Sequence, residues 1–210
     1  MIKIRMLPLG PMQTNCYVVA CEETEQAAVI DPSWDGAAIQ KVTEDEGWTI
    51  SHILLTHSHF DHVGALSHLY AQTSAPIHVH PDAVSLLRES PRAAALWGFT
   101  IPDPPEPHVM LQDGQMVTVG RLKLQVIFTP GHAPGHVSFY HEPGNVLFGG
   151  DVLFQQGIGR TDLPGGDYAT LIRSIREKLL VLPDDTRVYC GHGNPTTIGD
   201  EKRLNPFLQE

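Results

Sequence analysis

The chain has 210 residues, of which 41% are hydrophobic and 18% charged, so it can build a sizeable core and is not broadly disordered. Lys and Arg number 14 against 24 Asp and Glu, and the formal net charge of −10 argues against binding to a nucleic-acid backbone. The length suits one domain over residues 1–210, and no apolar stretch approaches the roughly 18 residues that cross a bilayer, so we expect no membrane partner.

The first third of the chain predicts strands that alternate with a helix. Short apolar stretches predict strands at residues 1–7, 16–20 and 27–30, with turn residues between them. Residues 35–46 have apolar side chains at helical spacing, and Gly47 is placed to end that helix. A further apolar strand is predicted at residues 50–55.

The rest of the chain continues this alternation. It predicts helices at residues 63–71 and 81–89, and a proline-rich surface loop bordering a pocket at residues 97–107. Asp167 can cap a helix that runs to Leu182. Strands are predicted at residues 77–80, 122–128, 137–140, 146–148 and 187–190. This order favours layered sheets with helices outside.

The strongest chemical signal follows the strand predicted at residues 50–55. His57, His59, Asp61 and His62 fall within six residues, directly after an apolar strand. Imidazole and carboxylate groups bind zinc, iron or manganese, and the mixture does not choose among these metals. The alternative without a metal is a solvated histidine-rich surface loop, but four ligand-type residues after a buried strand favour a metal site.

Three other apolar strands also end in a ligand-type residue. His132, Asp151 and His192 each follow such a strand beside glycines, which let the backbone approach closely. Each is weak evidence alone, because Gly-Asp is an ordinary turn and a lone histidine is usually structural. Together with the first cluster they predict one metal centre at the strand ends.

The run His57-Ser58-His59-Phe60-Asp61-His62, followed by His132, Asp151 and His192, resembles the metallo-β-lactamase superfamily. The resemblance implies the α/β (α+β) class and a four-layer αβ/βα sandwich, with two mixed sheets, helices outside and two metal sites at one edge. It implies that the first metal is held by His57, His59 and His132, the second by Asp61, His62 and His192, and that Asp151 bridges both.

Within that superfamily, the chain is similar to the short bacterial glyoxalase II-like metallohydrolases. The similarity rests on Thr129-Pro130-Gly131-His132, on the segment after Asp151, and on Gly157-Ile158-Gly159-Arg160. It implies hydrolysis of a thioester such as S-D-lactoylglutathione to D-lactate and glutathione by a metal-bridging hydroxide. Asp61 and Asp151 would be catalytic, and the cofactors would be two divalent ions, zinc first, with iron or manganese as alternatives.

The chain departs from the longer glyoxalase II enzymes where those enzymes hold glutathione. We expect it to be without their C-terminal helical domain, and Arg160 and Asp162 stand where a lysine and a tyrosine are found. Arg160 can pair a substrate carboxylate, or it can have a structural role in which it pairs Asp162 or Asp167. The substrate is therefore expected to be a small-molecule thioester, and a glutathione-derived thioester is expected to bind weakly.

Several alternatives remain open from the sequence. A mononuclear-iron persulfide dioxygenase and a lactonase or other esterase share the fold, whereas the acidic charge argues against a nuclease. His136 can support a ligand or stabilise a turn, and Cys190 fits a small core residue. Three cysteines cannot all pair within the chain, which favours a cytoplasmic protein, and nothing in the pattern indicates an oligomeric state.

Overall fold

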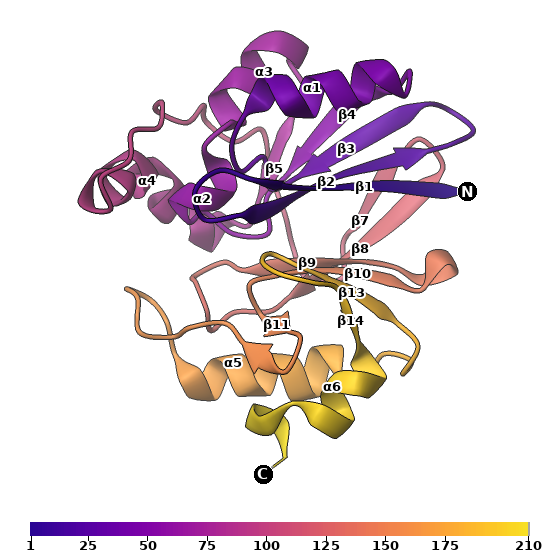
Figure 1. Ribbon diagram of the computed structural model, residues 1–210, viewed down its shortest axis with the longest axis vertical. Coiled ribbons are helices and arrows are strands. Elements are labelled where there is room, and N and C mark those ends of the chain that lie inside the picture. The colour runs from indigo at the N-terminus through magenta and orange to yellow at the C-terminus, as the bar shows by residue number, and fades with distance from the viewer. Residues whose placement is uncertain (210) are drawn as a thin grey trace.

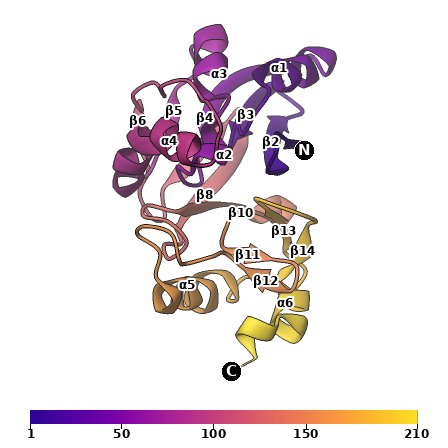
Figure 2. The same cartoon turned by 60° about the vertical axis from the view of Figure 1, so that its left-hand side comes forward.

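The computed structural model describes residues 1–209 and contains two six-stranded sheets. Figure 1 shows the N-terminal half above the C-terminal half, with the sheets facing each other and helices on the outer side of each. The same layers are visible after the rotation in Figure 2. The four-layer arrangement and the α/β class expected from the sequence are confirmed.

The first sheet has the strand order β1-β2-β3-β4-β5-β6. Strands β1 to β3 pair antiparallel, and the pairs from β3 to β6 are parallel because helical crossovers connect these strands. Its strands are β1 (Ile2–Leu9), β2 (Thr14–Cys21), β3 (Gln26–Ile30), β4 (Thr49–Leu54), β5 (Ile77–Val79) and β6 (Val109–Met110). Its helices are α1 (Gly36–Asp45), α2 (Phe60–Val63), α3 (Leu66–Thr73), α4 (Val84–Leu96) and a 3₁₀ turn (Pro81–Ala83).

The second sheet has the order β14-β13-β10-β9-β8-β7, in which only the β10–β13 pair is parallel. Its strands are β7 (Met116–Val119), β8 (Leu122–Phe128), β9 (Val137–His141), β10 (Val146–Gly150), β13 (Arg187–Cys190) and β14 (Thr196–Thr197). A small hairpin is formed by β11 (Leu153–Phe154) and β12 (Gly157–Ile158). The helices are α5 (Tyr168–Ser174), continued by a π turn (Ile175–Leu179), α6 (Ile198–Leu204), and 3₁₀ turns at Glu142–Gly144 and Pro206–Leu208.

Strand β2 shows how the layers are held together. All eight of its residues are buried, because it lies between β1 and β3 and is covered on both faces. Successive side chains of a strand point to opposite faces. Val18 therefore packs with the residues under the helices, and Val19 packs with the residues between the two sheets. Each fully buried valine contributes about 1.5–3 kcal/mol to stability.

The predicted helices are present, but three of them differ from their predicted bounds. The helix predicted to run from Asp167 to Leu182 ends at Leu179, at the end of the π turn. The helix predicted at residues 63–71 is divided into α2 and α3 around Gly64, where a Cβ atom would lie 2.4 Å from the Ser33 carbonyl oxygen. The helix predicted at residues 81–89 continues through Pro91 to Leu96. Leu87 and Ala94 are buried on one face of it, so tertiary packing outweighs the hydrogen bond that proline removes.

The sequence analysis missed the shortest elements, and it also missed β7 and α6, which have four and seven residues. Strands β6, β11, β12 and β14 have two residues each, too few for an alternating pattern to be recognised. Cys190 is a buried residue at the end of β13, as predicted. Within residues 1–209, no helix has the length and apolar character needed to span a membrane.

Candidate metal centre

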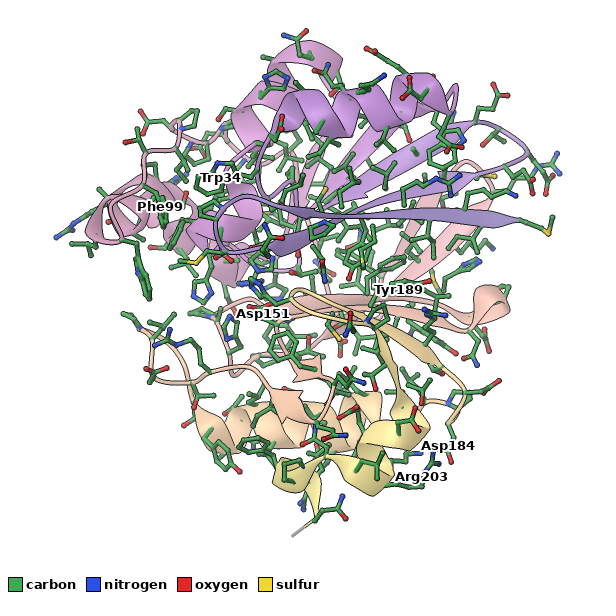
Figure 3. All side chains as sticks on the ribbon, viewed as in Figure 1. Trp34, Phe99, Asp151, Asp184, Tyr189 and Arg203 are labelled. Carbon is green, nitrogen blue, oxygen red and sulfur yellow. The ribbon has the colours of Figure 1, made fainter. Side chains whose placement is uncertain are left out.

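The predicted ligand residues meet between the two halves of the molecule. His57, His59, Asp61 and His62 follow β4, while His132, Asp151 and His192 follow β8, β10 and β13. Figure 3 places Asp151 at the junction of the upper and lower halves. The strand ends of both sheets therefore bring the ligand-type residues together at one site, as the sequence predicted.

Three imidazoles form the first group of ligand-type atoms. His59 Nδ1 lies 3.1 Å from His57 Nε2 and 2.9 Å from His132 Nε2. Burial lowers the pKa of all three histidines, that of His59 to about 3. Neutral imidazoles offer lone pairs, so this group can hold a divalent cation without first losing protons.

A carboxylate and two imidazoles form the second group. Asp61 Oδ2 lies 3.6 Å from His62 Nε2 and 3.3 Å from His192 Nε2. Burial opposes ionisation of Asp61, but His62 and His192 hold its pKa at about 2. Burial also opposes protonation of His192, yet Asp151 and Asp61 raise its pKa to about 9. The acidic side chains thus attract positive charge to this group, which a metal ion can supply.

Asp151 lies between the two groups. Its Oδ1 atom is 3.4 Å from His62 Nε2, and its Oδ2 atom is 3.6 Å from His132 Nε2. Within the described chain, Asp151 Oδ1 and His62 Nε2 are buried without a hydrogen-bond partner. Leaving two such atoms buried and unpaired costs free energy, and a shared cation would satisfy both. A Cβ atom on Gly191 would lie 1.9 Å from Asp151 Oδ1, so glycine is required there.

The outer nitrogen of four histidines is held by a neighbouring group. His57 Nδ1 lies 3.0 Å from Thr56 Oγ1, and His62 Nδ1 lies 2.9 Å from Asp31 Oδ2. Backbone carbonyl oxygens hold His132 and His192. The carbonyl oxygen of Arg160 lies 2.8 Å from His132 Nδ1, and that of Met12 lies 3.2 Å from His192 Nδ1. Such contacts fix ring orientation and leave Nε2 directed at the metal position.

Asp31 is the main residue that the sequence analysis missed. This carboxylate is 2% exposed, accepts hydrogen bonds from Thr56 N at 2.7 Å and Thr56 Oγ1 at 2.6 Å, and contacts His62. Asp31, His57 and His62 also lie within ligand distance of one another, but the Asp31 oxygens are already engaged. Asp31 follows the buried strand β3, so the strand-end signal that identified the ligands applied to it as well.

His136 supports the backbone of Asp151. Its Nε2 atom accepts a hydrogen bond from Asp151 N at 3.1 Å, and Nδ1 lies 2.9 Å from Thr129 Oγ1. The ring stacks on His57 with a centroid separation of 5.0 Å. Thr129 N also donates to His136 O. His136 therefore does both things that the sequence left open, supporting a ligand residue and closing a turn.

A cavity of about 840 Å³ opens over the ligand atoms. Arg160 lines it, and its guanidinium donates to both carboxylate oxygens of Asp162 at 2.7 Å. Besides His136, six histidines lie outside the ligand groups found among residues 1–209, as the sequence predicted: His52, His68, His78, His80, His108 and His141.

Comparisons with known proteins agree with the fold and identify a family. The family model of the metallo-beta-lactamase superfamily matches residues 9–192. Hydroxyacylglutathione hydrolase GloC of Haemophilus influenzae is 41% identical over 209 residues, covering 99% of this chain and 98% of GloC. Two crystal structures are each 42% identical. BLEG-1 B3 metallo-beta-lactamase has a TM-score of 0.92 with 100% of both chains covered, and TTHA1623 in a di-iron-bound form has 0.90 with 97% and 100% covered.

Proposed function

Since the chain belongs to the metallo-beta-lactamase superfamily, we propose that it is a dinuclear metallohydrolase that cleaves thioesters such as S-D-lactoylglutathione. The observation that carries the proposal is the position of Asp151, whose two oxygens face histidines of different groups. In this proposal His57, His59 and His132 hold one metal, Asp61, His62 and His192 hold the other, and Asp151 bridges them.

The two metal ions would supply a water of lowered pKa and a positive charge that stabilises the oxyanion developing on the substrate. Asp61 accepts a hydrogen bond from Thr14 Oγ1 at 2.8 Å and has a pKa of about 2. It therefore stays ionised and orients the attacking water rather than carrying a proton away. Zinc fits this mixed set of nitrogen and oxygen ligands, and the di-iron form of TTHA1623 supports iron as the alternative.

The leaving group favours a thioester over an amide. A thiolate has a conjugate-acid pKa of about 8.5 and departs without a strong general acid. An amide nitrogen must be protonated as it leaves, which demands a positioned acid. The similarity to hydroxyacylglutathione hydrolase GloC supports the same choice of substrate class.

A direct test combines elemental analysis of the purified protein with hydrolysis of S-D-lactoylglutathione. The proposal expects about two metal ions per chain, together with release of D-lactate and free thiol in equal amounts. Iron at about one ion per chain, with oxygen uptake on glutathione persulfide, would identify a dioxygenase instead. The presence of Asp61, His62 and His192 beside Asp151 supports the hydrolase.

A β-lactam is the second substrate class to test. The observation that favours it is the 42% identity to BLEG-1 B3 metallo-beta-lactamase over the whole of both chains. The ring amide of a β-lactam would occupy the same cavity over the ligand atoms. Comparing kcat/KM for a chromogenic cephalosporin, a simple lactone and a thioester on one metal-loaded preparation ranks these three substrate classes.

A further inference from the structure

The cavity over the ligand atoms has a wall that the proposed chemistry does not use. At its floor lie His59, His132 and Asp151, and along one side lies a single stripe of α4. Leu86, Ala93 and Leu96 are the apolar members of this stripe, at positions that fall on one face of a helix. In Figures 1 and 2, α4 projects from the upper half of the molecule, on the same side as the β12–α5 segment below it.

Two large apolar side chains at the end of α4 are unusually exposed. Leu96 is 84% and Trp97 51% exposed, and both line the cavity. Exposed apolar surface beside a site marks a place where a ligand or partner is bound. Because this surface lines the same cavity as the ligand atoms, a substrate held at the metal centre can reach it.

An aromatic cluster ties this wall to the ligand loop. Phe60 stands between His59 and Asp61 in the sequence and is 7% exposed, and its ring centroid lies 6.3 Å from that of Trp97 and 6.0 Å from that of Phe99. The ring of Phe99 lies 5.8 Å from that of Trp34, and Figure 3 shows this pair beside α4. The apolar wall is thereby fixed relative to the residues that would hold the metals.

The opposite wall is also apolar. Leu163, Pro164 and Gly165 line it together with Pro134. A Cβ atom on Gly165 would lie 2.4 Å from Pro134 Cγ, so this segment packs closely on the loop that carries His132. A substrate arm entering the cavity thus meets carbon on two sides.

The charges that line the cavity do not suit a thiol with two carboxylates, such as glutathione. Arg160 and Arg92 are the arginines that line the cavity, and Asp162 already engages the guanidinium of Arg160 through two hydrogen bonds. Arg92 has a side chain 83% exposed and a Glu89 carboxylate 3.6 Å away. Glu89 and Asp82 line the same cavity and repel a second carboxylate.

From these contacts we infer that the preferred substrate is a thioester with an aliphatic or aromatic acyl arm, which packs against Leu96 and Trp97. The inference rests on the proposed thioester hydrolysis and deepens it by naming the substrate class. It predicts that catalytic efficiency rises with the apolar area of the acyl group, since each added methylene leaves water for the wall.

The test uses thioesters of one small neutral thiol, N-acetylcysteamine, with acetyl, hexanoyl and phenylacetyl groups, on the metal-loaded enzyme. We expect kcat/KM for the hexanoyl and phenylacetyl compounds to exceed that for the acetyl compound about tenfold or more. Leu96→Ala should reduce this ratio about three- to tenfold, and Leu96→Met should retain it. Val181→Ala is the matched control, since Val181 is 70% exposed and lies outside the cavity lining.

A binding measurement separates this inference from the proposed function. S-Hexyl- and S-methyl-N-acetylcysteamine are thioethers without a carbonyl to hydrolyse, and calorimetry gives their dissociation constants. About tenfold tighter binding of the hexyl compound, lost in Leu96→Ala and Trp97→Ala, supports the apolar wall even if no thioester is turned over. Equal binding of the two thioethers, or no binding of either, overturns the inference that the apolar wall binds the acyl arm. Absence of thioester turnover overturns the proposed thioester hydrolysis but leaves the inference about the apolar wall unaffected.

Discussion

The floor and the wall of the cavity are built in opposite ways. On the floor, His57, His62, His132 and His192 each have an outer nitrogen held by a second group, and the ligand residues come from both sheets. The wall is one helix stripe ending in exposed apolar side chains, of which Leu96 is 84% exposed. Several hydrogen bonds fix the floor, whereas the side chains at the end of the wall are exposed to solvent.

This difference separates chemistry from specificity. A ligand group whose rings are fixed by hydrogen bonds tolerates little change, because each lost contact loosens a metal ligand. Exposed wall residues can change without disturbing the fold, because few native contacts depend on them. We therefore expect substitutions on the floor to alter metal content and substitutions on the wall to alter KM.

The largest effect is expected at the residue shared by both ligand groups. Asp151→Ala should lower bound metal at both positions and abolish hydrolysis, because its two oxygens face His62 on one side and His132 on the other. Elemental analysis and thioester turnover measure this directly. Asp184→Ala, which removes an exposed surface partner of Lys202, is the control and should keep the parent's metal content. Full metal occupancy in Asp151→Ala would falsify the bridging assignment.

The next comparison lies within the floor itself. His57→Ala and His59→Ala should deplete the first metal, and His62→Ala and His192→Ala the second, so each variant keeps about one ion per chain. Cobalt substitution followed by absorption spectroscopy distinguishes a site of three imidazoles from one with a carboxylate.

Histidines outside the floor are the control for this comparison. His68 contacts Gln40 and His108 contacts Tyr70 through ring nitrogens, and neither belongs to a ligand group. Replacing either by alanine should leave metal content at the parent's value. If the control variants lost as much metal as the ligand variants, the assignment of residues to two sites would be wrong.

A smaller effect is expected at Asp31, which contacts the ligand residue His62. Asp31→Asn keeps the size of the side chain but removes its charge, and with it the strong acceptor for the His62 ring. Loss of such a contact typically costs about ten- to a hundredfold in metal affinity. In a chelator titration followed by elemental analysis, the metal assigned to Asp61, His62 and His192 should be lost before the other metal. Asp45→Asn, at an exposed carboxylate of α1, is the control. Equal retention of both metals against the chelator would contradict a supporting role for Asp31.

The sequence predicted the floor because its signal is local. Each ligand residue follows an apolar strand, and strand ends can be located from apolar runs and turn residues. The pairing of ligands into two groups came from family resemblance, since spacing alone does not place His192 beside Asp61. Asp31 was passed over because a single aspartate after a strand is also an ordinary turn residue.

The wall could not be predicted in the same way. The helix was predicted only to residue 89, but packing of Leu87 and Ala94 carries α4 past Pro91 to Leu96. Trp97 lies in the predicted pocket-bordering loop, but which of its neighbours face the cavity depends on how α4 packs against Phe60. Such tertiary placement leaves no periodic trace in the sequence.

The smallest effect is expected at Arg160, where floor and wall meet. Its carbonyl oxygen holds His132, while its guanidinium lines the cavity and is paired with Asp162. Arg160→Ala keeps the carbonyl contact and removes only the cation, so KM for S-D-lactoylglutathione should rise a few-fold while kcat changes less. An exposed ion pair of this kind is worth about 0–1 kcal/mol. Asp162→Ala is the reciprocal variant: it frees the guanidinium and should lower KM for the same substrate by a similar factor. If neither variant moves KM, Arg160 has only a structural role and the acyl arm alone determines affinity.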